Sequence, residues 1–192
     1  MQARGDRFES DILHQRVIMS DVTKFDNFLD KSLYLKMRTY SYEMYHSGEH
    51  VLKTHKCWGN RVVLDSFPVL IYRIPDEEEV MKELTKTIVE KTGINYSVNA
   101  AFYYWTRFSY IPWHRDAHLD AAITVYLNDK WTENNGGYLM YEDGDEVKAI
   151  LPQKNRAIWQ RNGVRHTTSA VNYDGDIRYT IQCWLTEIKD GE

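Results

Sequence analysis

The stretch SVNAAFYYWTRFSYIPWHRDAHLDAAITVYLN, residues 97–128, marks the point where the sequence changes from helical to β patterning. It contains two runs rich in aromatic and β-branched residues, which favour strands. Between the runs, the segment HRDAHLD (114–120) holds two His-x-Asp triplets. Residues two apart on an extended chain point to the same side, so either triplet could supply two metal ligands.

The rest of the C-terminal half continues as short strands separated by turn signals. NNGG (134–137) is a turn sequence of the kind that joins two strands. Many short strands at this spacing predict a sandwich, jelly roll or barrel. The strands predicted after residue 96 are 97–113, 121–128, 138–142, 147–152, 156–160, 165–171 and 178–187.

Helical patterning dominates the N-terminal part. We expect a helix within residues 22–50 that ends at SGEH, then a short strand at 69–74 and a clearer helix at 75–93. Acidic residues 76–79 favour the start of that second helix because they complement the helix dipole, and Gly93 favours its end. The apolar residues at mostly helical spacing in the first helix are Phe25, Phe28, Leu29, Leu33, Leu35 and Met37. The predicted fold class is α+β, mainly β.

Composition narrows the classes of protein. A chain of 192 residues, 43% of them hydrophobic, is long enough to bury a core, and we expect one domain over 1–192, helical over about 1–95 with a β-core over about 96–188. The net charge of −4 argues against nucleic-acid binding. No apolar run has the length of a membrane span, and two cysteines are too few for a disulfide framework. We therefore expect a cytoplasmic protein with no membrane partner.

A third metal ligand is available further along the chain. His166 lies 52 residues after His114, near the start of a predicted strand. Two histidines and one carboxylate with open positions form the facial triad of non-haem Fe(II) oxygenases. The residues before His114 continue a strand directly into it, whereas His118 and Asp120 lie in the connection to the next strand. The pair His114 and Asp116 is therefore favoured over the second triplet.

Arg178 begins the last predicted strand, RYTIQCW. An arginine inside a small β-core needs an anionic partner, because an unpaired buried charge is costly. The sequence shows no obvious acidic mate, and a ligand carboxylate would form a two-pronged pair with the guanidinium. A dicarboxylic keto acid could chelate the metal at one end and reach Arg178 with the other. Tyr126 could add a phenol hydrogen bond.

An ordered set of motifs now points to a known family. The set is HRD, ITVYLNDKW, GGYLMYEDG, RAIWQ, then His166 and RYTIQCW. A single His-x-Asp triplet is common by chance, but this order is specific. Over roughly residues 100–187 the chain resembles Fe(II)- and 2-oxoglutarate-dependent dioxygenases of the prolyl 4-hydroxylase type.

The resemblance implies a double-stranded β-helix, a jelly roll of cupin-like form, behind N-terminal helices. It implies that Fe(II) is bound by His114, Asp116 and His166, and that 2-oxoglutarate and O2 are co-substrates. It further implies that Arg178 and Tyr126 bind the far carboxylate of 2-oxoglutarate.

Two aromatic residues follow from the resemblance as well. Tyr104 lies ten residues before the first iron ligand, where animal oxygen-sensing prolyl hydroxylases carry a tyrosine that touches the co-substrate. Because this strand is aromatic throughout, a shift of that role by one residue stays open. Trp184 falls where those enzymes carry a tryptophan beside the substrate proline. The loop after Asp116 is shorter than theirs, so their substrate contacts do not transfer.

The predicted reaction is hydroxylation of a substrate C–H, most simply of a prolyl residue in a peptide or protein, with release of succinate and CO2. Within the same chemistry, a free amino acid or small metabolite is the alternative substrate. Nucleic-acid dealkylation is disfavoured, because such enzymes usually carry a second arginine at the position of Trp184. A non-oxidative cupin-like metal-binding protein, or a binding module, would need neither Arg178 nor 2-oxoglutarate. The oligomeric state does not follow from the sequence.

Overall fold

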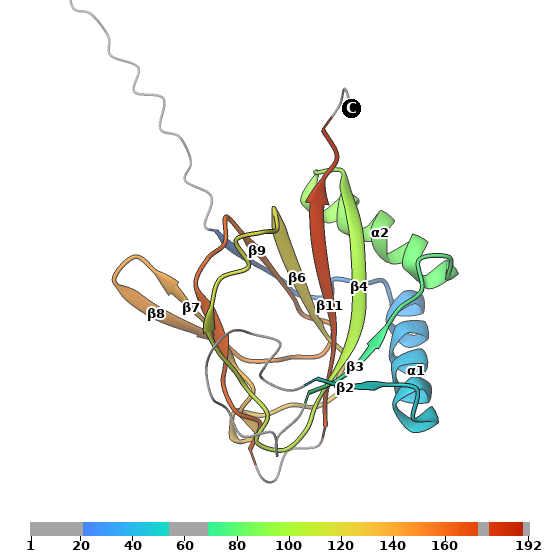
Figure 1. The fold of residues 1–192 in the computed structure, drawn as a ribbon, viewed down its shortest axis with the longest axis horizontal. Helices are drawn as coiled ribbons and strands as arrows, with labels where there is room; N and C mark the ends of the chain where they lie inside the picture. The colour runs from blue at the N-terminus through green and yellow to red at the C-terminus, as the bar shows by residue number, and fades with distance from the viewer. Residues whose placement is uncertain (1–20, 54–68, 173–176, 190–192) are drawn as a thin grey trace, which may run out of the picture.

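The computed structural model describes residues 21–53, 69–172 and 177–189. Two β-sheets form the body of the molecule (Figure 1). The larger has the strand order β1-β9-β6-β11-β4-β3-β2, and the smaller has the order β5-β10-β7-β8. The named pairs within both sheets are antiparallel. The predicted class, mainly β with a double-stranded β-helix core, is confirmed.

Two α-helices, α1 (Lys31–Ser47) and α2 (Glu79–Thr92), accompany the sheets in the described part of the chain. Neither is long and apolar enough to cross a membrane. A short 3-10 turn, η2, covers Glu133–Asn135. The strands are β1 (Val22–Phe25), β2 (Val51–Lys53), β3 (Val69–Arg73), β4 (Tyr96–Trp105), β5 (Ile111–His114), β6 (Ala121–Tyr126), β7 (Leu139–Asp143), β8 (Glu146–Ile150), β9 (Ala157–Arg161), β10 (His166–Thr168) and β11 (Arg178–Glu187).

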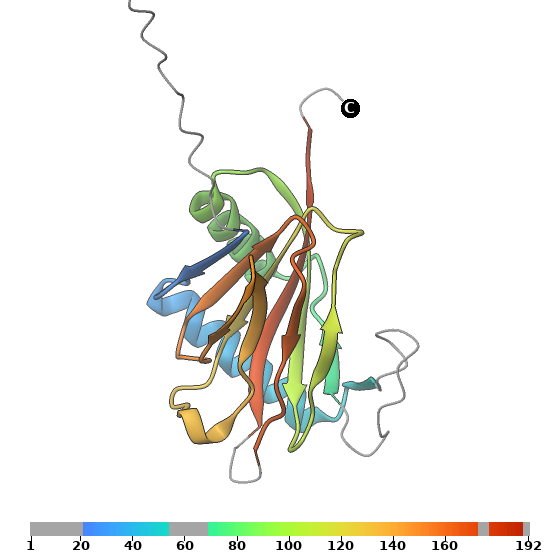
Figure 2. The same ribbon diagram turned by 90° about the vertical axis from the view of Figure 1, so that its left-hand side faces the viewer.

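The two faces of the large sheet have different neighbours. Both helices cover its outer face, on the side away from the small sheet (Figures 1 and 2). Successive side chains of a strand point to opposite faces, so every second residue of the central strands packs against the helices. This main hydrophobic core includes Phe28, Leu33, Met37, Leu84, Ile88, Phe102, Ile123, Ile181 and Leu185. The inner face is left for the cavity described below.

The first predicted helix begins later than expected. The segment Val22–Phe25 is strand β1, which pairs with β9 in register from Val22 with Gln160 to Phe25 with Ala157. Helix α1 then starts after Asp30, whose carboxylate accepts a hydrogen bond from the Leu33 amide, a typical N-cap. The partner of β1 lies far away in the sequence, which local periodicity cannot reveal. The helix ends before Gly48, within the predicted SGEH break.

Further corrections concern the exposed Leu35 and the start of α2. Leu35 is 47% exposed and so does not belong to the apolar stripe of α1. Helix α2 begins at Glu79, because the preceding acidic residues form a turn in which the Glu78 amide bonds the Pro75 carbonyl at 3.3 Å. It ends at Gly93 in a left-handed conformation, as predicted. The N-terminal part is also not purely helical, since β1, β2 and β3 extend the large sheet.

The predicted strand 97–113 is two strands in different sheets. β4 ends at Trp105, and β5 starts at Ile111 after a turn in which the Ser109 amide bonds the Thr106 carbonyl at 3.0 Å. The change of sheet carries the chain from the large sheet to the small one immediately before His114. The turn therefore decides on which side of the interior His114 lies.

We predict that Asn155→Ala lowers the free energy of unfolding by about 2–4 kcal/mol, because two buried main-chain groups lose their partners. The buried Asn155 side chain accepts a hydrogen bond from the Leu29 amide at 3.0 Å and donates one to the Leu29 carbonyl at 2.7 Å. Asn162→Ala is the matched control, since both asparagines have φ near 53° but Asn162 is exposed. Urea unfolding measures the free energy of unfolding of both variants. An equal decrease in the two would mean that backbone strain, and not the lost hydrogen bonds, causes the effect.

Candidate metal centre and cavity

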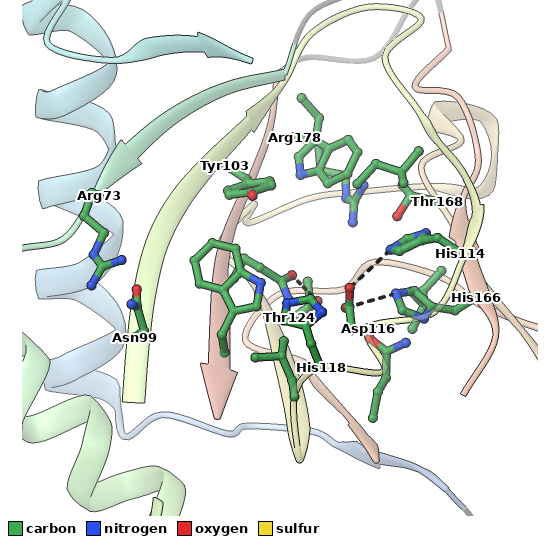
Figure 3. Close-up of a pocket in the computed structure, with 17 residues that line it drawn as sticks. Arg73, Asn99, Tyr103, His114, Asp116, His118, Thr124, His166, Thr168 and Arg178 are labelled. Carbon is green, nitrogen blue, oxygen red and sulfur yellow. Dashed lines mark hydrogen bonds and ion pairs between the residues drawn. The ribbon is translucent and has the colours of Figure 1, made fainter. Parts of the chain in front are cut away.

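Three of the predicted site residues meet at one point between neighbouring strands. His114, the last residue of β5, is paired directly with His166, the first residue of β10. Asp116 follows in the turn after β5, with its carboxylate oxygens 3.9 Å from His114 Nε2 and 3.8 Å from His166 Nε2 (Figure 3). One ligand atom from each residue lies within 4.8 Å of the others, the only such group among the described residues.

Both imidazole rings are held so that Nε2 faces this point. His114 Nδ1 lies 2.8 Å from the Pro112 carbonyl, and His166 Nδ1 lies 2.9 Å from the Val164 carbonyl. A carbonyl can only accept, so each Nδ1 carries the proton and donates. This leaves the Nε2 lone pairs directed at the Asp116 side of the group, which is how histidine ligands are usually oriented.

The electrostatics also suit a metal. Burial, and then the neighbouring His114, lower the pKa of His166 to about 4. His166 is therefore neutral at pH 7, the form in which an imidazole binds a metal. Two neutral imidazoles and one carboxylate are the donor set of non-haem Fe(II) sites, so the residues fit that ion.

The second His-x-Asp triplet does not converge in this way. His118 lines the cavity, but it does not belong to the group of three. Asp120 instead accepts a hydrogen bond from the Glu187 amide at 2.8 Å. The geometry therefore favours the first triplet, as the strand leading into His114 suggested.

Arg178 is the most unusual residue of the interior. It is only 1% exposed, yet its Nε and Nη1 atoms have no hydrogen-bond partner among the described residues. Its guanidinium carbon lies 4.5 Å from the centre of the Trp105 ring and 5.1 Å from that of Tyr126. Burial lowers the pKa of Arg178, because removal from water disfavours the charged guanidinium. A ligand carboxylate would supply the missing acceptors.

Tyr126 lies beside Arg178 on the inner face of β6. Its hydroxyl is fully buried and also has no hydrogen-bond partner among the described residues. Burial raises the pKa of Tyr126 more strongly than the nearby Arg178 charge lowers it. The phenol therefore stays protonated and can donate to an anion that binds Arg178.

The predicted glycine turn makes room for Arg178. A Cβ atom on Gly137 would lie 3.0 Å from Arg178 Cδ, and one on Gly136 would lie 2.3 Å from the Ala170 carbonyl oxygen. Both glycines have positive φ, near 65°. The turn signal was readable from the sequence, but its second role, to let the backbone approach a buried arginine, was not.

The three candidate metal ligands and Arg178 line one cavity of about 430 Å³. That volume lies in the range of sites that enclose small organic ligands. Other lining residues come from the inner face of the large sheet and from the loop after Asp116, and they include Asn99, Tyr103, Trp105, His118, Gln160, Gln182 and Trp184. Sequence reasoning missed Trp105 and the three amides, although strand alternation places Trp105 on the same face as Tyr103.

Tyr104 does not reach the cavity. It points to the outer face of β4, where its hydroxyl donates to the Ser41 carbonyl of α1 at 3.0 Å. Tyr103, one residue earlier, lines the cavity instead. The residue that lines the cavity therefore lies eleven residues before His114, not ten. On a strand, a shift of one residue moves the side chain to the other face of the sheet. Trp184 lines the cavity, as expected for a residue beside a substrate.

Residues 99–186 match the family model described as the 2OG-Fe(II) oxygenase superfamily. No curated protein matches this sequence.

Solved structures share the fold at low sequence identity. A prolyl 4-hydroxylase from Pseudomonas putida has a TM-score of 0.68 and 15% identity, over 89% of this chain and 95% of that one. A prolyl hydroxylase from Trichoplax adhaerens, solved with a hypoxia inducible factor peptide fragment, has a TM-score of 0.73 and 16% identity, over 88% and 84%. The α-ketoglutarate-dependent epimerase SnoN from nogalamycin biosynthesis has a TM-score of 0.67 and 11% identity, over 87% and 78%.

We predict that Gly137→Ala weakens 2-oxoglutarate binding at least tenfold, because the added methyl group displaces Arg178. Gly144→Ala is the matched control: Gly144 has φ 61°, against 67° for Gly137, but nothing lies within 4 Å of its added Cβ. Both variants should lose about 1 kcal/mol of stability from backbone strain. Calorimetric titration with Mn(II) in the site measures the affinity, and equal binding by the two variants would contradict the prediction.

The metal-free protein should lose about 3 kcal/mol of stability between pH 6.5 and pH 4, because the pKa of His166 falls from its ordinary 6.5 to about 4 on folding. Within this window the unfolded chain takes up a proton that the folded chain does not. Stability therefore falls as the pH falls. Urea unfolding at several pH values measures the slope, and His166→Gln should flatten it. An unchanged slope in that variant would show that other groups cause the loss.

Proposed function

This chain carries a 2OG-Fe(II) oxygenase domain over residues 99–186, and on that premise we propose that it hydroxylates a prolyl residue of a peptide or protein. Fe(II), 2-oxoglutarate and O2 are the cofactor and co-substrates, and succinate and CO2 are the by-products. One observation carries the assignment of the site: a buried arginine without an anionic partner lines the same cavity as two histidines and a carboxylate.

In this proposal His114, Asp116 and His166 would hold Fe(II) through two imidazole nitrogens and one carboxylate. The bound iron and 2-oxoglutarate supply the oxidising chemistry. Arg178 would bind the far carboxylate of 2-oxoglutarate through its unpaired guanidinium nitrogens, and the Tyr126 hydroxyl would donate a further hydrogen bond. The site thereby fixes which end of the keto acid faces the three ligands.

The walls of the cavity support a proline as the reacting group. Trp184 and Tyr103 lie edge to face with ring centres 5.9 Å apart, and both line the cavity. Such aromatic faces pack well against a saturated ring and exclude water from it. The similar structures from Pseudomonas putida and Trichoplax adhaerens are prolyl hydroxylases, and the second was solved with a peptide.

A small-molecule substrate is the competing proposal within the same chemistry. The similar SnoN structure is that of an epimerase from nogalamycin biosynthesis. A non-oxidative cupin-like protein is the competitor outside it, and such a protein would have no use for a buried unpaired Arg178.

Anaerobic addition of Fe(II) and then 2-oxoglutarate to the metal-free protein should produce a weak visible charge-transfer band that needs both additions. Arg178→Met should bind iron normally but lose the band at matched 2-oxoglutarate, because the carboxylate loses its charged partner. Arg38→Met is the matched control, since Arg38 lies on α1, outside the cavity, and is ion-paired with Asp129. Metal binding without any band in the unaltered protein would favour the cupin-like alternative.

In air, the same protein should form succinate in proportion to one oxygen atom added to proline in a supplied peptide. Mass spectrometry of the peptide and a succinate assay give this ratio. Oxidation of free proline or another small metabolite in place of the peptide would move the assignment to the small-molecule alternative.

A further inference from the structure

Four residues form a straight row across the inner face of the large sheet. Asn99 on β4 is paired with Trp184 on β11, Trp184 with Ala122 on β6, and Ala122 with Gln160 on β9. Directly paired residues of antiparallel strands point to the same face. The row spans three strand spacings, which is about 14 Å between the backbones at its two ends.

Each end of this row carries an amide group with one unpaired polar atom. The Asn99 Oδ1 and Gln160 Nε2 atoms are buried and have no hydrogen-bond partner among the described residues. Both residues line the cavity, and Gln160 is only 4% exposed. By contrast, the neighbouring Gln182 accepts a hydrogen bond from the Thr124 hydroxyl at 2.7 Å. A buried polar atom without a hydrogen-bond partner destabilises the protein, and a suitable ligand would remove that penalty.

The chemistry of these ends selects the class of ligand. An amide oxygen needs a donor, and an amide nitrogen needs an acceptor. A carboxylate offers acceptors only and an ammonium offers donors only, whereas every non-proline residue of a peptide offers one of each. A peptide advances about 3.3–3.6 Å per residue, so it needs about four residues to span the row. A free amino acid can reach one end but not both.

The row also has a direction relative to the candidate metal centre. Gln160 shares a small hollow with Asp116 and His166, so its end lies beside the metal ligands. Asn99 lies at the other end, next to Arg73 and away from the three ligands (Figure 3). A chain laid along the row would pass Trp184 before it reaches the metal end.

We propose that the substrate is an extended peptide of at least four residues, bound across β4, β11, β6 and β9 with its main chain hydrogen-bonded to Asn99 and Gln160. This inference rests on the proposed function for the reaction, but the binding mode can be tested without turnover. Because the contacts are to the main chain, peptides with one proline flanked by alanines are sufficient probes.

The experiment measures the affinity of such peptides, in a series of increasing length, for the protein loaded with Mn(II) and 2-oxoglutarate. Affinity should rise steeply until the peptide reaches about four residues. Asn99→Leu and Gln160→Met keep the side-chain volume but remove the hydrogen bonds, and each should weaken the longer peptides about tenfold. For both variants, the loss of affinity for free proline should be smaller than the loss for the longer peptides. Gln153→Met, at an exposed position, should leave the affinity for every probe unchanged.

The outcomes separate the binding mode from the reaction. Equal affinity of the two variants and the unaltered protein for long peptides would overturn the inference, as would free proline that binds as tightly as the longest peptide. Hydroxylation of the peptide or of free proline would still support the proposed oxygenase reaction. The expected length dependence in a protein that forms no succinate would support the peptide row and overturn the proposed reaction.

Discussion

The pairing of β5 with β10 is the interaction on which the candidate site depends. It places His114 directly opposite His166, although they are 52 residues apart in the sequence. Two further contacts hold the same strands and their ends together: the Thr167 hydroxyl bonds the Ile111 carbonyl at 2.5 Å, and Arg115 Nη1 bonds the Gly163 carbonyl at 2.9 Å. With a different register between β5 and β10, the two imidazoles would not both lie beside the Asp116 carboxylate, even if the rest of the fold were unchanged.

The two faces of the large sheet differ in character, one apolar and one polar. The outer face is apolar and packs on two helices, which supplies most of the hydrophobic stabilisation. The inner face carries an arginine and several amides into a cavity. Since alternate residues of one strand serve both faces, a shift of one residue exchanges them, and this is why Tyr103 rather than Tyr104 lines the cavity.

Much of this arrangement could be predicted from the sequence, and the exceptions share a cause. Most strands of the C-terminal half and the buried Arg178 follow from local pattern, although the break between β4 and β5 does not. The choice of His114 with Asp116 follows from the strand that leads into His114 and, more strongly, from the family order of motifs. The resemblance to the oxygenase family is confirmed by the family model over residues 99–186. Strand β1 and the space that Gly137 leaves for Arg178 could not be predicted, because both depend on partners distant in the sequence.

The inner face retains groups that weaken the ligand-free protein. A buried guanidinium without an anion, a buried phenol without a partner and one unpaired atom in each of two amides reduce stability relative to an apolar interior. A fold with a large apolar core on its other face can tolerate this cost, so the core and the cavity are linked through one sheet. The unpaired groups also indicate which ligand groups could bind them. Arg178 and Tyr126 fit a carboxylate, and the row from Asn99 to Gln160 fits a peptide. The buried polar groups without hydrogen-bond partners therefore indicate the function more clearly than the well-packed apolar core does.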